Sequence, residues 1–186
     1  DRDRLRVNGT AAPCDAGIGA RLFEFLALFR PSPDSFFDVQ TESDIPLAAG
    51  LAASASGFAS VVLALDDLFG WDLARRDLSI LARLGSGSAC RSVYDGFVEW
   101  PAGKRADGLD SFASPLSRPW PAFRIGIVTV SEDRKPVGSR EGMRRTVRTS
   151  KLYEAWPRQV ERDLADLKIA LERKDFSLLG QAAERN

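Results

Sequence analysis

The sequence contains no histidine, and only two of its 186 residues are cysteine. Without histidine, these residues cannot supply an imidazole general base, a Ser-His-Asp triad or histidine ligands for a metal. Cys14 and Cys90 lie far apart and form no CxxC pair, so the chain holds neither a disulfide framework nor a zinc module. This cysteine usage fits a reducing, cytoplasmic location.

Long apolar runs and an excess of charge are also missing. No apolar stretch reaches the ~18 residues that a membrane helix needs, and the N-terminal Asp1-Arg2-Asp3-Arg4 has no apolar signal core. Lys plus Arg and Asp plus Glu each total 26, so the net charge is zero and no basic excess would attract nucleic acid. A hydrophobic share of 44% and a charged share of 28% are typical of a soluble globular chain with a real core.

Hydrophobic periodicity predicts strands and helices in mixed order, which is typical of the α+β class. Pro31 ends the first predicted helix, and Asp72 can cap a later one. Pro, Gly, Ser and charged residues dominate 101–121, which predicts a surface connection. The predicted strands are 4–7, 35–42, 92–100 and 123–131, and the predicted helices are 15–30, 55–69, 73–84, 139–148, 150–156, 157–174 and a short one from about 175.

The stretch Gly50-Leu-Ala-Ala-Ser54-Ala-Ser56-Gly57 is rich in small residues and runs into an apolar helix. Small side chains let backbone N–H groups approach an anion, and a helix N-terminus adds partial positive charge. The stretch therefore predicts a phosphate cradle in which Ser54 can donate its hydroxyl. It is not a Walker A loop, because no Gly-Lys-Ser/Thr follows. The alternative is that the small residues only allow close helix packing.

A second glycine-serine stretch, Gly85-Ser-Gly-Ser-Ala-Cys-Arg91, ends in an arginine. A guanidinium can grip a phosphate or carboxylate through two parallel hydrogen bonds. The alternatives are a plain turn for the glycine-serine run and a surface ion pair for Arg91. Two such loops in one chain favour the ligand interpretation over either loop alone.

Three segments resemble the signatures of a known family. PLAAGLAASASG (46–57) resembles motif 2 of the GHMP kinases, in the form used by mevalonate diphosphate decarboxylases. GSGSACRSVYDGFVEW (85–100) is similar to that family's second signature nearly letter for letter, and SREGMRRTVRTSKLYEAW (139–156) matches the bacterial version of a third. The resemblance runs in colinear order from about Arg4 to Asn186, and the second signature makes this branch of the superfamily the best match.

The resemblance implies an activity. The family phosphorylates the tertiary 3-hydroxyl of mevalonate 5-diphosphate with Mg-ATP, and loss of the 3-phosphate together with CO2 gives isopentenyl diphosphate. ATP and Mg2+ are therefore the expected cofactors, and a mevalonate phosphate is the expected partner. Phosphoryl transfer depends on positioning and charge neutralisation, so loops and an arginine suffice without histidine.

The resemblance also assigns site residues. Ser54 would lie on the nucleotide phosphates, Arg91 would bind the acidic groups of the substrate, and Ser139 lies where the family contacts the substrate diphosphate. For Ser139 the alternative is a helix cap, and Cys90 and the four tryptophans are expected to serve packing. The expected phosphate-loop residues are Ala48, Ala49, Gly50, Leu51, Ala52, Ser54 and Ser56, and the expected substrate-site residues are Ser86, Gly87, Ser88, Ala89, Cys90, Arg91, Ser139 and Arg140, with no metal ligand expected in the chain.

The sequence departs from the family pattern at four positions. Leu47 replaces a Thr, Ala53 replaces the first of two paired serines, Asp95 replaces a Gly, and Arg140 occupies a position that is often a small hydroxyl residue. These changes leave the substrate open, since related enzymes accept mevalonate or its monophosphate and some only phosphorylate. A GHMP kinase without decarboxylation is therefore one alternative, and a non-catalytic binding protein that kept the fold is another.

Two family motifs do not occur in the sequence. These are an N-terminal Tyr-Trp-Gly-Lys motif and a later Asp-Ala-Gly-Pro-Asn motif that carries the catalytic aspartate. We therefore expect no catalytic residue within this chain, and Asp107, Asp110 and Asp133 are interpreted as solvated surface charge. The chain also lacks a starting Met, so we expect a central fragment that is inactive alone.

The expected architecture is the two-lobed GHMP kinase fold, incomplete at both ends. A ribosomal-protein-S5-like lobe would span 1–118, and the start of a ferredoxin-like lobe would span 119–186. The resemblance further implies a homodimer in the cytoplasm, with neither nucleic acid nor membrane as a partner.

Overall fold

The computed structural model describes residues 2–44, 53–116, 119–128 and 137–185. They form two compact units. The first contains residues 1–94 and 100–114, and the second contains 95–99 and 115–186. Strands and helices are mixed in both, in agreement with the α+β prediction.

A small sheet forms the first part of unit 1. Its strands β1 (Arg4–Val7), β2 (Thr10–Ala12) and β3 (Asp38–Thr41) lie in the order β2-β1-β3. Asn8 and Gly9 both have positive φ, 48° and 75°, which suits the tight antiparallel turn between β1 and β2. Strand β3 runs parallel to β1, with Leu5 beside Val39. The predicted strand at 4–7 is confirmed, and the one at 35–42 is confirmed in its second half.

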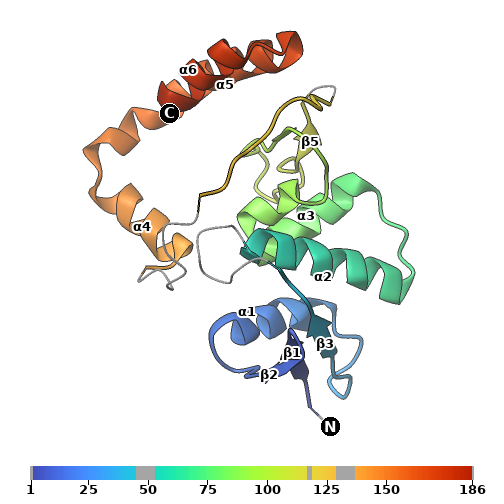
Figure 1. The fold of residues 1–186 in the computed structure, drawn as a ribbon. Coiled ribbons are helices and arrows are strands. Elements are labelled where there is room, and N and C mark those ends of the chain that lie inside the picture. The colour runs from blue at the N-terminus through green and yellow to red at the C-terminus, as the bar shows by residue number, and fades with distance from the viewer. Residues whose placement is uncertain (1, 45–52, 117–118, 129–136, 186) are drawn as a thin grey trace. The chain divides into compact units, whose positions relative to one another are not determined.

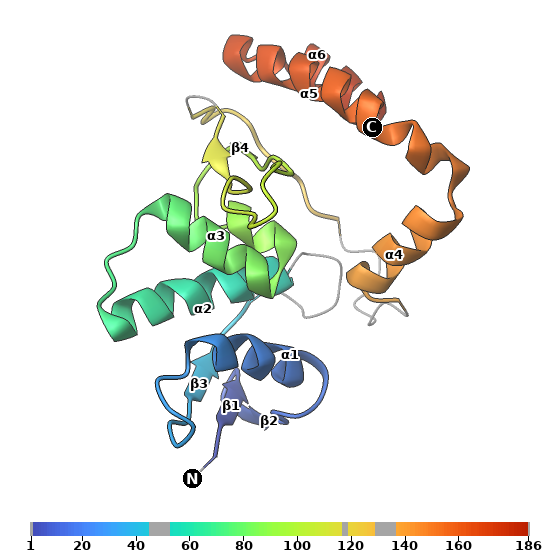
Figure 2. The ribbon, with the colours of Figure 1, turned by 180° about the vertical axis from the view of Figure 1, so that it is seen from behind.

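Three helices complete unit 1. Helix α1 (Gly17–Leu26), continued by η1 (Ala27–Phe29), lies along the sheet, and α2 (Ala53–Phe69) and α3 (Arg75–Gly85) lie side by side beyond it (Figures 1 and 2). All three helices were predicted within a few residues. The Phe25 and Phe58 rings meet edge to face at 5.2 Å and join α1 to α2. The core is apolar and includes Leu5, Leu22, Phe23, Phe25, Leu26, Phe58, Val62, Leu65, Leu78 and Ala82.

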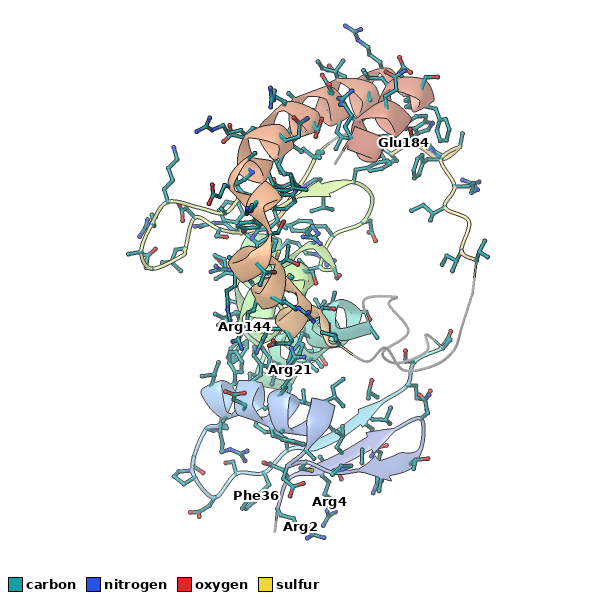
Figure 3. All side chains as sticks on the ribbon, turned by 90° about the vertical axis from the view of Figure 1, so that its left-hand side faces the viewer. Arg2, Arg4, Arg21, Phe36, Arg144 and Glu184 are labelled. Carbon is teal, nitrogen blue, oxygen red and sulfur yellow. The ribbon has the colours of Figure 1, made fainter. Side chains whose placement is uncertain are left out.

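Gly85 shows why the first glycine of the second loop is small. A Cβ on Gly85 would lie 2.1 Å from a ring carbon of buried Phe58. Arg21 of α1 reaches the same point: its Nη2 donates to the Gly85 carbonyl at 3.4 Å, and Figure 3 shows Arg21 where α1 faces the other helices. At this glycine, close helix packing is therefore the physical requirement.

The predicted cap at Asp72 is wrong. Asp72 lies in the left-handed region (φ 54°), and Ala74 is the N-cap of α3, without a side-chain cap bond. The turn after α2 instead depends on the Asp66 carboxylate, which accepts the Leu73 N–H at 3.0 Å. Asp72 and Gly70 both have positive φ, and this conformation helps the chain to reverse direction between α2 and α3.

The segment 100–114 is more than the predicted surface connection. Ser111 and Ala113 are buried, at 1% and 0% exposure. Two arginines of α3 bind its carbonyl groups, with Arg76 donating to Leu109 at 3.2 Å and Arg83 to Gly108 at 3.0 Å. The prediction failed because polar, glycine-rich composition signals a turn but does not reveal which side chains the turn buries.

Asp3 fastens the start of β1 to the loop before β3. Its carboxylate accepts Nη2 and Nη1 of Arg30 at 2.7 and 3.1 Å, and the Phe37 N–H at 2.8 Å. The hydrogen bond from Arg30 holds the pKa of Asp3 below its usual value, helped by the Phe37 N–H and opposed by partial burial. The ion pair therefore links three parts of unit 1 that lie apart in sequence.

Replacing Asp3 with asparagine should lower the free energy of unfolding by about 1–2 kcal/mol at pH 7, because hydrogen bonds to a charged group are lost. A depressed folded-state pKa stabilises the fold above the unfolded value, near pH 4, and the stabilisation disappears as pH falls through the folded value. Urea titrations should show that the difference in free energy of unfolding between wild type and variant is smaller at pH 3 than at pH 7. Exposed Asp34→Asn is the control, and an equal gap at both pH values would contradict the prediction.

Unit 2 is mostly helical. Its helices are α4 (Ser139–Thr149), η3 (Lys151–Glu154), α5 (Trp156–Arg173) and α6 (Phe176–Arg185), which confirms the predicted order. Helices α5 and α6 pack together as a hairpin that turns at Lys174, in the left-handed conformation. Buried Asp163 of α5 pairs with Arg185 of α6 at 3.0 Å. No described helix is both long and apolar enough to cross a membrane.

The predicted strands at 92–100 and 123–131 are largely wrong. Only β4 (Val98–Glu99) forms in the first, and β5 (Ser114–Pro115) was not predicted. Residues 123–128 are not in a strand, and residues 129–131 lie outside the described residues. Ile125, Ile127 and Val128 are 79%, 69% and 85% exposed. A strand needs a neighbour for its backbone groups, and within the described part of the chain none pairs with this segment.

Candidate functional site

The first candidate loop is described only at its end. Ala48, Ala49, Gly50, Leu51 and Ala52 lie outside the described residues. Ser54 and Ser56 are in the first described turn of α2, where the Ser56 hydroxyl donates to the Ala53 carbonyl at 3.1 Å. Both serines line a hollow of about 300 Å3, whose other walls combine apolar side chains of the sheet, α1 and α2 with polar residues that include Glu42 and Asp44. Ser54 is thus half-buried at the rim of a cavity.

The second candidate loop folds as a short 3-10 turn, η2 (Gly87–Arg91), directly after α3. Its Ala89 and Cys90 side chains are completely buried, so at these two positions the side chains serve the core. Ser86, Gly87 and Ser88 are half-buried, and Arg91 is exposed. The loop therefore turns its small residues inward and presents the guanidinium outward.

Ser79 of α3 anchors this loop through hydrogen bonds of its buried hydroxyl. Its hydroxyl donates to the Cys90 carbonyl at 2.9 Å and accepts the Ala113 N–H at 2.8 Å, and the side chain is fully buried. One hydroxyl thus joins α3, the η2 loop and the segment 100–114. Sequence reasoning missed Ser79, although a polar residue on the apolar face of a helix, beside Leu78 and Ala82, is a usable signal.

Cys90 is not a nucleophile. Burial raises the pKa of its thiol, and the nearby guanidiniums of Arg91 and Arg83 only partly oppose this. A buried, protonated thiol is unreactive. The structure therefore agrees with the packing role expected for Cys90.

Ser139 and Arg140 begin helix α4 in unit 2, whereas Ser54 and Arg91 belong to unit 1. Gly138 is the N-cap and no side chain caps the helix, so Ser139 is its first residue instead. Both residues are exposed. Their helix is strongly basic, with Arg144 (labelled in Figure 3), Arg145 and Arg148 following Arg140.

Asp107 and Asp110 have structural roles. Asp107 pairs with Arg105 at 2.5 Å, and Asp110 accepts the Lys104 and Arg105 N–H groups at 2.7 and 3.1 Å. The hydrogen bond from Arg105 lowers the pKa of Asp107, and that from the Lys104 N–H lowers the pKa of Asp110. Both carboxylates therefore organise an exposed loop, and Asp133 lies outside the described residues. Within the described ranges, His, Cys, Asp and Glu side chains form no cluster suited to a metal.

Family models match both parts of the chain. Residues 1–113 match the diphosphomevalonate decarboxylase-like N-terminal domain, and residues 125–185 match the mevalonate 5-diphosphate decarboxylase C-terminal domain. Diphosphomevalonate decarboxylase mvd1 of Aspergillus fumigatus is 43% identical over 152 residues, which cover 80% of this chain and 37% of the relative. Among the curated relatives compared, the chain spans between 36% and 52% of their length.

Solved structures of similar proteins share the fold. Mevalonate diphosphate decarboxylase from Staphylococcus aureus is 32% identical with a TM-score of 0.84, and the match covers 99% of this chain and 56% of that one. A structure described as MDDEF in complex with MVAPP, AMPPCP and magnesium is 36% identical with a TM-score of 0.80, and the match covers 100% and 57% of the two chains. The expected GHMP-kinase type of fold is thereby confirmed.

Proposed function

The chain belongs to the diphosphomevalonate decarboxylase family, and from this membership we propose that the protein catalyses the ATP-dependent decarboxylation of mevalonate 5-diphosphate. The γ-phosphoryl group of ATP passes to the 3-oxygen, and the proton of the 3-hydroxyl is released to solvent. The bond from C3 to that oxygen then breaks and releases phosphate, while the bond from C2 to the carboxylate carbon breaks and releases CO2. The electron pair of the broken carbon–carbon bond forms the double bond of isopentenyl diphosphate. ADP is the other product.

The observation that carries this proposal is the η2 loop. Its inner residues are locked into the core and its last residue, Arg91, is exposed, so a permanent positive charge sits at a fixed place on the surface of unit 1. A guanidinium of this kind binds a carboxylate or phosphate through paired hydrogen bonds. Arg91 would hold an acidic group of the substrate, and Ser86 and Ser88 would add hydroxyl donors beside it.

The nucleotide is assigned to the beginning of α2. Ser54 is available there at the rim of a hollow, and a helix of 17 described residues directs its positive dipole end toward this turn. The proposed loop runs from Ala48 to Ser56. Ser54 would donate to a phosphate oxygen, while Ser56 already donates to its own helix.

Magnesium fits this donor set as an ion held mainly by nucleotide. Mg2+ is commonly bound by substrate phosphates with few protein ligands, and the described residues contain no acidic cluster that would form a separate cage. Ser54 is assigned to a phosphate oxygen of the nucleotide, and no described residue is assigned to the ion itself. When bound, the ion neutralises charge on the transferred phosphoryl group.

The remaining expectations stay predictions. They are a domain boundary near residue 118, a homodimer, a cytoplasmic location, and contacts of Ser139 and Arg140 with the substrate diphosphate. A basic helix α4 supports the last of these, because Arg140, Arg144 and Arg148 recur every four residues and so share one face.

The test is release of ADP and CO2 by protein expressed at the natural length of its gene, supplied with Mg-ATP. Mevalonate, its 5-phosphate and its 5-diphosphate are compared in parallel. ADP and CO2 in equal amounts with the 5-diphosphate are expected. ADP without CO2 would move the protein to the kinases, an outcome made possible by the changes at Ala53 and Arg140. Neither ADP nor CO2, with ATP binding retained, would favour a non-catalytic binding protein.

A further inference from the structure

Trp100 lies directly behind the η2 loop. The centroid of its ring is 5.7 Å from the guanidinium carbon of Arg91, within the range of a cation–π contact. The far end of the indole also covers Gly87, where an added Cβ would lie 3.0 Å from the ring. One aromatic side chain therefore contacts both the middle and the end of the loop.

The indole is itself fixed. Its Nε1–H donates to the Ser111 hydroxyl at 2.9 Å, and that hydroxyl donates to the Pro101 carbonyl at 2.9 Å. Ser111 is 1% exposed and Trp100 is half-buried, so the bonds meet at a buried hydroxyl. The ring plane is thus set by a buried polar chain whose atoms are all in unit 1.

Arg91 needs such a support. Its side chain is exposed, and within the described ranges the contact made by its guanidinium is the Trp100 ring. A free arginine loses much rotamer freedom when it grips a ligand. A ring that already orients the guanidinium reduces this loss before the ligand arrives.

We infer that Trp100 is a positioning residue for substrate binding: it orients Arg91, and its ring leaves little room beside Gly87. This inference rests on the proposed function, because it assumes that Arg91 binds the acidic substrate. Trp100 would act through Arg91, and the inference assigns it no contact with the nucleotide.

The test compares Trp100→Leu, Trp100→Phe and Ser111→Ala with wild type, using calorimetric binding of mevalonate 5-diphosphate and steady-state kinetics. Trp100→Leu should raise Kd and KM for this substrate about 3- to 30-fold, which is the size of a cation–π contact. The KM for ATP should not change. Trp100→Phe keeps a ring face and should recover part of the loss, and Ser111→Ala should give a smaller rise.

A double-mutant cycle separates positioning from a general packing defect. In an Arg91→Met background, Trp100→Leu should change Kd by less than about twofold, because the group through which it acts is gone. The same rise in both backgrounds, or a parallel rise in KM for ATP, would overturn the inference. If Trp100→Leu does not fold, the cycle is run with Trp100→Phe.

A measurement without ligand tests the contact between Trp100 and Arg91 independently of the proposed function. The indole ring current should shift the Arg91 side-chain protons upfield in the NMR spectrum of wild type, and Trp100→Leu should abolish this shift. Failure of wild type to bind mevalonate 5-diphosphate would remove the proposed function while the shift still reports on the pair. Absence of the shift in wild type would overturn the positioning role, whatever the substrate proves to be.

Discussion

Replacing Arg91 with methionine is expected to lower kcat/KM for mevalonate 5-diphosphate by about 100- to 1,000-fold. Methionine keeps much of the apolar stem and removes the charge. Loss of one partner from a desolvated, hydrogen-bonded ion pair costs about 2–5 kcal/mol, and each ~1.4 kcal/mol is a factor of ten. The free protein should stay folded, because the Arg91 head is exposed while the core of the loop is formed by Ala89 and Cys90.

Arg91→Lys distinguishes charge from shape. Lysine keeps the positive charge but loses the planar fork that binds two oxygens at once, so an intermediate loss is expected. Arg6→Met is the matched control, because Arg6 is an exposed arginine of unit 1 on strand β1, and it should retain wild-type kinetics. Wild-type kcat/KM in Arg91→Met would remove Arg91 from the site, and with it the main observation behind the proposed function.

Local pattern was sufficient for most helices of this chain. Helices α1, α2 and α3 each bury an apolar stripe, and the periodic spacing of their hydrophobic residues can be recognised in the sequence. The turn at Asn8-Gly9 has a local cause as well, because few residues other than glycine and asparagine adopt positive φ readily. In these cases the information is local, so sequence reasoning succeeds.

Strand prediction failed where partners decide the outcome. Residues 123–128 carry an alternating pattern of high β-propensity, yet Ile125 and Ile127 remain exposed and no described strand pairs with them. Propensity describes how well a residue fits a half-buried pleated surface, and it cannot supply the neighbouring strand. Ring contacts instead hold the start of this segment, where Phe123 meets Phe97 at 5.1 Å.

For the candidate site, too, some features could be predicted from the sequence and others could not. The motif predicted Arg91 as a ligand for acidic groups, which stays a prediction, and the structure places its side chain on the surface of unit 1. The contacts that support it were missed, because Ser79 lies in an ordinary helix, Trp100 at the end of a predicted strand, and Ser111 in a segment that composition marks as surface. Their roles depend on contacts between residues 11 to 34 positions apart in sequence, which local patterns do not encode.

Ser79→Ala should lower the free energy of unfolding by about 2–4 kcal/mol, even though it removes a single oxygen. The Cys90 carbonyl and the Ala113 N–H both lose their partner in a site that water does not reach. Each buried polar group left unpaired costs about 1–3 kcal/mol. Urea unfolding should show a lower midpoint with an unchanged slope, since the surface exposed on unfolding is the same.

Ser60→Ala is the control for this change. Ser60 is exposed on α2, so its replacement should alter the free energy of unfolding by no more than about 0.5 kcal/mol. Ser79→Cys places a slightly larger and weaker donor at the same position and should fall between alanine and wild type. A Ser79→Ala protein as stable as Ser60→Ala would mean that the loop and the segment 100–114 do not depend on this hydroxyl. If the prediction holds, the free energy that fixes the η2 loop comes from a buried serine of α3, and Arg91 owes its fixed place on the surface to a group that never touches the ligand.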